Sequence, residues 1–120
     1  MDTLVIGLAG LMGAFGVMLA AAGAHGPKAG TGLDSAGYLL MIHACAAIAV
    51  TLATRSGLTL RPLGLAATAG FVIGAALFAA DVAMRAYLGH RLFPFAAPTG
   101  GMLLIIGWLL VAIAALAARR

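Results

Sequence analysis

The chain has 120 residues, of which 64% are hydrophobic and only 8% are charged. A soluble domain carries about 25% charged residues, so water is not the solvent for most of this surface. A membrane-spanning helix needs roughly 20 predominantly apolar residues, so the length leaves room for four spans and no separate soluble domain. The basic residues are scattered at segment ends, which favours anionic lipid headgroups over nucleic acid as their neighbours.

Four apolar runs predict an all-α membrane protein, an antiparallel bundle of four transmembrane helices in a single domain over residues 1–120. The predicted spans are about 3–24, 37–53, 63–88 and 99–118. The first run lacks the basic region of a signal peptide, so we expect it to be retained. Asp34 or Ser35 is expected to cap the second helix, because short polar side chains satisfy the free N–H groups there.

The distribution of basic residues predicts the topology. Four spans place both termini and the loop with Arg55 and Arg61 on one side of the membrane, together with the arginines at 119–120. The other side carries Lys28 and Arg91. The positive-inside rule then predicts a multi-pass protein of the inner (plasma) membrane with cytoplasmic termini.

Polar side chains are expected to gather at the non-cytoplasmic ends of the spans. We call this set the polar crown: His25, Asp34, Tyr38, His43, Asp81, Arg85, His90 and Arg91. The cytoplasmic halves of the spans hold almost only apolar and small residues, so a pore through one monomer has no polar lining there. The pattern predicts a closed bundle with a polar crown on one side.

Asp81 and Arg85 are four residues apart on the third span and can therefore pair on one helix face. A carboxylate inside a membrane is by default a candidate functional group. Here it lies within two turns of the interface, where pairing and snorkelling make a structural role the stronger interpretation.

His43 lies inside the apolar band of the second span. It could ligate a metal or relay a proton, but a neutral imidazole hydrogen-bonded within the protein is the more common case. His25 lies at a different depth, which argues against a haem held by both. A metal site built from His25, His43, His90 and a carboxylate stays open, although no known ligand spacing is present, and no cofactor is assigned.

Helix-packing contacts are expected at Gly70, Gly74, Gly100, Gly101 and Trp108. Gly70 and Gly74 form a GxxxG pattern, which permits close approach of a second helix. Trp108 falls in mid-span, so its indole N–H needs a partner, for which His43 or a carbonyl near a glycine is suitable.

The segment from Leu92 to Pro98 is apolar but contains two prolines, so it is not expected to form a regular helix. Its backbone must be buried against protein or lie at the interface. We expect it to fold over the bundle with Phe93 and Phe95 inserted. The N–H groups of residues 99–101 would then open the fourth helix as a potential anion or acceptor site.

Several segments together resemble a known family. They are Gly13-Ala14-Phe15-Gly16 to Gly23-Ala24-His25-Gly26, Tyr38 to His43-Ala44, Gly74 to Leu77-Phe78, and Ala97-Pro98-Thr99-Gly100-Gly101 to Gly107-Trp108. The chain is similar over nearly its whole length to the small membrane proteins of domain-of-unknown-function family 423. That family includes YgdD-like bacterial inner-membrane proteins and a eukaryotic relative, transmembrane protein 256. The resemblance implies a four-helix membrane protein and no established reaction, and the Asp81/Arg85 pair looks like a subgroup feature.

The sequence favours a non-enzymatic scaffold, assembly or lipid-interacting protein. Its expected partners are membrane lipids and a second copy or other membrane proteins, with no nucleic acid. The first alternative is a small oligomeric transporter or channel whose vestibule is lined by Asp81, His43 and His25. The second is a membrane metal or quinone site.

Overall fold

The computed structural model describes residues 1–119, and this part of the chain folds into four long helices without strands. They are α1 (Asp2–Ala24), α2 (Leu33–Arg55), α3 (Arg61–Leu88) and α4 (Ala96–Ala118), with a short 3-10 helix η1 (Gly26–Lys28) between α1 and α2. Each of the four is long and apolar enough to cross a membrane. The predicted fold class is therefore confirmed.

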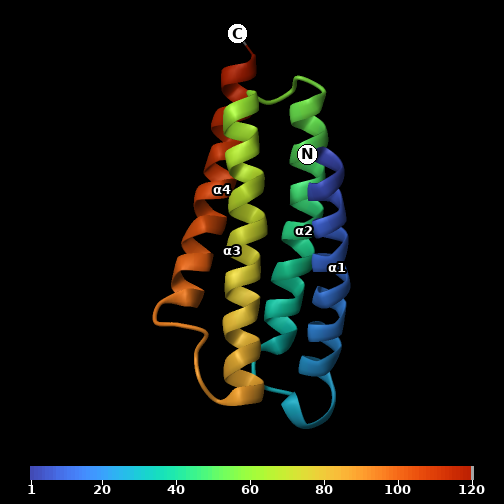
Figure 1. The fold of residues 1–120 in the computed structure, drawn as a ribbon, viewed down its shortest axis with the longest axis vertical. Coiled ribbons are helices and arrows are strands. Elements are labelled where there is room, and N and C mark those ends of the chain that lie inside the picture. Colours follow the sequence, from blue (N-terminus) through green and yellow to red (C-terminus); the bar gives the residue numbers. More distant parts are fainter. Residues whose placement is uncertain (120) are drawn as a thin grey trace.

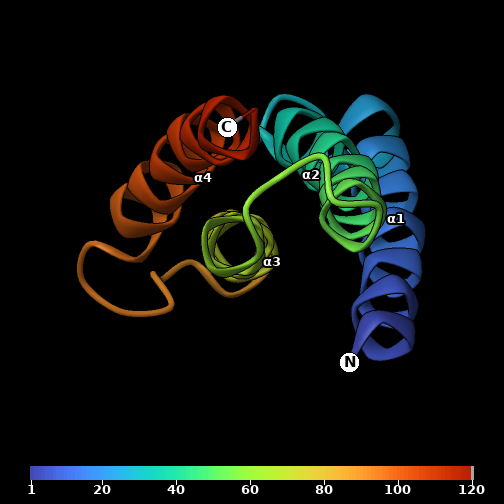
Figure 2. The ribbon, with the colours of Figure 1, turned by 90° about the horizontal axis from the view of Figure 1, so that it is seen from above.

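The helices form an elongated bundle with extents of 52 × 25 × 20 Å (Figure 1). Each helix packs mainly on its neighbour in sequence, α1 on α2, α2 on α3 and α3 on α4. Seen along the bundle, α1 and α4 lie at opposite edges (Figure 2). We call the end with both termini the terminal end, and the end with the α1–α2 and α3–α4 connections the loop end.

The start of α2 differs from the prediction. The helix begins at Leu33, and its N-cap is Gly32 in the left-handed conformation with φ of 88° and no side-chain cap. The prediction that Asp34 or Ser35 caps this helix is therefore wrong, because both lie inside its first turn. A glycine adopts this positive φ without steric cost, so the connection turns one residue before the polar side chains.

The start of α4 also lies earlier than predicted. Phe95 is the N-cap, with φ of 66°, and the helix begins at Ala96. Pro98 therefore occupies the first turn, where a missing N–H costs no helical hydrogen bond. The predicted acceptor site at residues 99–101 is wrong, because these residues lie within the helix and the N–H of Thr99 already donates to Phe95 O.

The aromatic residues of the α3–α4 connection do not insert into the bundle. Phe93 is 44% exposed and Phe95 is 70% exposed, which corrects the expectation that both are buried. The interior beneath them is filled by small residues of α4, and Ala96 is fully buried. Both residues are instead exposed in the α3–α4 connection, as a membrane interface allows for aromatic side chains.

Close approach between helices depends on glycine. A Cβ on Gly37 of α2 would lie 2.5 Å from the backbone of α1 at Ala20 N and Gly16 O. A Cβ on Gly100 of α4 would lie 2.6 Å from Gly74 O of α3. In lipid the hydrophobic effect does not bring helices together, so close packing of backbones stabilises these helix pairs instead. In the most apolar stretch of each outer helix, α1 and α4, only 17% is buried within the bundle, so most of the surface of these helices faces the surroundings.

Candidate functional site

His43 is held by two hydrogen bonds in the middle of the bundle. It is 4% exposed, its Nδ1 is 2.7 Å from Leu39 O, and its Nε2 accepts a bond of 3.0 Å from Trp108 Nε1. The indole N–H can only donate, so Nε2 must be the accepting nitrogen and Nδ1 carries the proton that is donated to Leu39 O. Both nitrogens are therefore occupied, and neither has a lone pair left for a metal.

Phe71 of α3 completes an aromatic cluster with these two residues. Its ring centroid lies 5.4 Å from that of His43 and 4.7 Å from that of Trp108, and Phe71 is fully buried. The three rings come from α2, α3 and α4. Since α2 and α4 are not sequence neighbours, this cluster and its hydrogen bond join the two halves of the bundle.

Replacing Trp108 with phenylalanine is expected to destabilise the bundle by about 1–3 kcal/mol, because His43 Nε2 is left as a buried acceptor without a donor. Unfolding by sodium dodecyl sulfate in mixed micelles, followed by circular dichroism, measures the loss. Tyr38→Phe is the control, since Tyr38 is 53% exposed, and it should leave the transition unchanged. Equal stability of the two variants would contradict a structural role for the indole bond.

Asp81 connects α3 to the loop that follows it. Its side chain is 2% exposed, Oδ1 accepts the N–H of Leu92 at 2.8 Å, and Oδ2 pairs with Arg85 at 3.3 Å. The Arg85 side chain is 45% exposed and reaches the surface at the loop end. Both carboxylate oxygens thus have structural partners, and the pair fixes the connection into α4.

The remaining crown residues do not converge on one point. The Asp34 carboxylate accepts the N–H of Ser35, His90 Nδ1 lies 3.0 Å from Arg91 O, and His25 ends α1 as an exposed cap. Within residues 1–119 no group of three His, Cys, Asp or Glu side chains is placed to hold a metal. The three histidines therefore do not form the metal site considered from the sequence.

The glycines selected from the sequence occupy different environments. Gly74 and Gly100 lie against each other across the α3–α4 contact, and a Cβ on Gly70 would lie 3.2 Å from Leu103 O. A Cβ on Gly101 would meet nothing within 4 Å. The GxxxG pattern of α3 is thus used within the monomer, and Gly101 is open to the surroundings.

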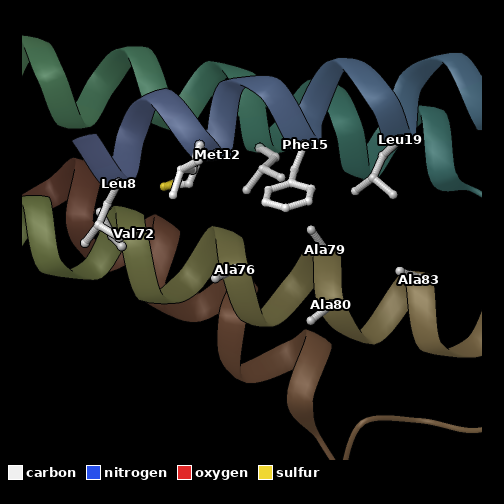
Figure 3. Close-up of a pocket in the computed structure, with 11 residues that line it drawn as sticks. Leu8, Met12, Phe15, Leu19, Val72, Ala76, Ala79, Ala80 and Ala83 are labelled. Carbon is white, nitrogen blue, oxygen red and sulfur yellow. The ribbon is translucent and has the colours of Figure 1, made fainter. Parts of the chain in front are cut away.

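A groove between α1 and α3 was not anticipated from the sequence (Figure 3). It encloses about 480 Å³. Its wall on α1 is made of large apolar side chains: Leu8, Leu11, Met12, Phe15 and Leu19. Its wall on α3 is mainly alanine: Val72, Ala76, Ala79, Ala80 and Ala83. Leu40 of α2 also contributes to the lining. The groove exists because small α3 side chains leave a space that the α1 side chains do not fill.

Leu8 and Val72 mark one end of this groove, where their side chains lie close together (Figure 3). Both residues also line a second pocket of about 300 Å³ that extends toward the terminal end. The surface between α1 and α3 is therefore divided into two apolar pockets, one toward each end of the bundle.

Lys28 contacts α3 beyond Ala83, the last α3 residue that lines the first pocket. Its ammonium donates to Ala86 O at 2.7 Å and lies 5.2 Å above the centre of the Tyr87 ring. The sequence predicts this lysine to be a topology signal near anionic lipid headgroups, but it does not predict its contact with α3. The spacing along α3 places Ala76, Ala80, Ala83 and Tyr87 on one helix face. This pattern could have predicted an apolar groove along α3 with a polar group beyond its end.

These features define the class of the protein: a multi-pass membrane protein built from four apolar helices with a mostly structural set of internal polar groups. Residues 19–101 match the model of the family described as "Protein of unknown function (DUF423)", and the chain belongs to that family. The resemblance seen in the sequence is confirmed. No curated protein and no solved structure matches the chain.

Proposed function

We propose that this protein is a non-enzymatic membrane protein that acts by holding membrane lipid in the groove between α1 and α3. The observation that carries the proposal is the lining of this groove, whose eleven residues all have apolar side chains. In a bilayer such a space is filled by hydrocarbon, because an empty groove would lose the dispersion contacts of its walls.

The state of the polar crown supports this proposal over a catalytic or transport role. His43 has both ring nitrogens in hydrogen bonds, and Asp81 has partners on both carboxylate oxygens. A proton relay or a vestibule would need one of these groups to face a ligand. The groove, in contrast, is an apolar space that no side chain of residues 1–119 fills.

We also propose that the termini face the cytoplasm. The positive-inside rule supports this orientation through the arginines of the terminal end. Two of them, Arg55 and Arg61, line a shallow pocket with residues 1–3, and Arg55 lies 3.4 Å from Asp2. The orientation can be tested by introducing a cysteine at position 57 or 90 and labelling intact cells with an impermeant maleimide. Label at 90 and none at 57 is expected, and the opposite result would reverse the proposed orientation.

Filling the groove tests the proposed function. Ala76 is an exposed residue of α3 that lines the groove, and Ala76→Phe is expected to remove one tightly retained lipid per protein. Ala66→Phe is the matched control, because Ala66 is equally classed as exposed on α3 and lies outside the groove. Native mass spectrometry of protein extracted with mild detergent counts the lipid. Equal lipid retention by both variants, or no lipid on the wild type, would overturn the proposal.

A further inference from the structure

We infer that the groove holds one acyl chain of an anionic phospholipid from the leaflet at the loop end, with Lys28 binding the lipid phosphate. This inference rests on the proposed function and specifies its ligand. It follows from three features: the length of the groove, the position of Lys28 about one helical turn beyond its last α3 residue, and the lack of an acidic partner for that lysine among residues 1–119.

The length of the groove matches one leaflet. Its α3 wall extends from Val72 to Ala83, which is about 16 Å at about 1.5 Å per residue. The hydrocarbon core of a bilayer is about 30 Å thick, so the groove covers about half of it. Leu8 and Val72 mark the end of the groove away from the loop end, where the second pocket begins (Figure 3).

The position of Lys28 corresponds to that of a lipid headgroup. Ala83 is the last α3 residue of the groove, and Tyr87 lies one turn further along the same face, about 6 Å toward the loop end. The Lys28 ammonium lies above that tyrosine ring. A phospholipid with a chain in the groove would therefore have its phosphate beside this ammonium group.

The chemistry of Lys28 fits an anion. The ammonium has three donors and donates one of them to Ala86 O, which leaves two for a ligand. Ion pairs among residues 1–119 are Arg55 with Asp2 and Arg85 with Asp81, so Lys28 has no carboxylate partner within the described chain. Its 3-10 turn is held in place by the Thr31 hydroxyl, which donates to Lys28 O. A half-buried cation without an acidic partner at the end of an apolar groove is complementary to an anionic lipid.

The experiment compares two lipids that differ only in headgroup charge. Delipidated protein in a neutral detergent is titrated with phosphatidylglycerol and with phosphatidylcholine of identical acyl chains, and native mass spectrometry measures the bound fraction. The wild type is expected to bind phosphatidylglycerol about five-fold more tightly, the effect of one basic residue near an anionic surface. Lys28→Gln should abolish the preference, and Lys28→Arg should keep it.

Arg91→Gln is the matched charge control, because it removes one exposed positive charge from the same end of the bundle and should leave the preference intact. Equal loss of preference in Lys28→Gln and Arg91→Gln would overturn the inference in favour of a general surface field. Equal binding of both lipids by the wild type, with weaker binding of both by Ala76→Phe, would overturn the inference and leave the proposed function standing. A dimer that Ala76→Phe abolishes would show that a second copy occupies the groove and would overturn both.

Discussion

Replacing Gly37 with leucine is expected to prevent α1 from packing on α2 and to leave little folded protein in the membrane. Even a Cβ at this position would lie 2.5 Å from both Ala20 N and Gly16 O. These are backbone atoms of a regular helix, so they cannot rotate away as a side chain could. Overpacking costs about 1–3 kcal/mol when side chains can adjust. We expect a loss above about 3 kcal/mol here, measured by unfolding in sodium dodecyl sulfate mixed micelles.

Gly13→Leu provides the control for this prediction. Gly13 lies on α1, in the same helix pair, but a Cβ there would meet nothing within 4 Å. The variant is expected to stay within about 0.5 kcal/mol of the wild type, as for other surface substitutions. If Gly13→Leu were as destabilising as Gly37→Leu, the close α1–α2 contact would not be the cause.

Replacing Asp81 with alanine is expected to release the connection between α3 and α4 and to destabilise the bundle by about 2–4 kcal/mol. The substitution removes the acceptor of the Leu92 N–H and the partner of Arg85. Leu92 is 38% exposed, so the cost comes mainly from the lost hydrogen bond to a charged group, which contributes about 1.5–3 kcal/mol. Arg85 adds only a modest amount, because its side chain is 45% exposed and can reach water. The same unfolding measurement, with hydrogen exchange at the Leu92 amide, follows both effects.

Two further variants separate these contributions. Asp81→Asn retains an oxygen that can accept the Leu92 N–H, so it should recover more than half of the stability lost by Asp81→Ala. Asp34→Asn makes the same charge change at the loop end, where the carboxylate bonds only to the next residue, and should have little effect. A loss for Asp34→Asn equal to that for Asp81→Ala would mean that overall charge, and not the bond to Leu92, stabilises the loop.

The spans were predictable because lipid imposes a simple requirement. A run of about 20 apolar residues must be helical to satisfy its backbone, so all four helices could be placed from the sequence. The bond between Trp108 and His43 was foreseeable for a related reason, since an indole N–H in mid-span needs an acceptor and few are present. Asp81 and Arg85 could likewise be paired from their spacing alone.

The helix starts and the groove were harder to predict. Gly32 and Phe95 begin α2 and α4 through positive φ angles, and neither position has a distinctive polar cap. The groove depends on which faces of α1 and α3 oppose each other, although these helices are far apart in sequence and touch little. The role of Lys28 depends on the same arrangement, because Ala86 is 58 residues away along the chain.

Native mass spectrometry combined with metal analysis, on protein extracted gently from its own membrane, tests the central claim most directly. If the protein is non-enzymatic and holds lipid in the groove between α1 and α3, we expect bound phospholipid and no stoichiometric metal, quinone or haem. A stoichiometric metal or chromophore would contradict this account. It would require the bonds of His43 or Asp81 to open for a ligand, and would make the polar crown the working site.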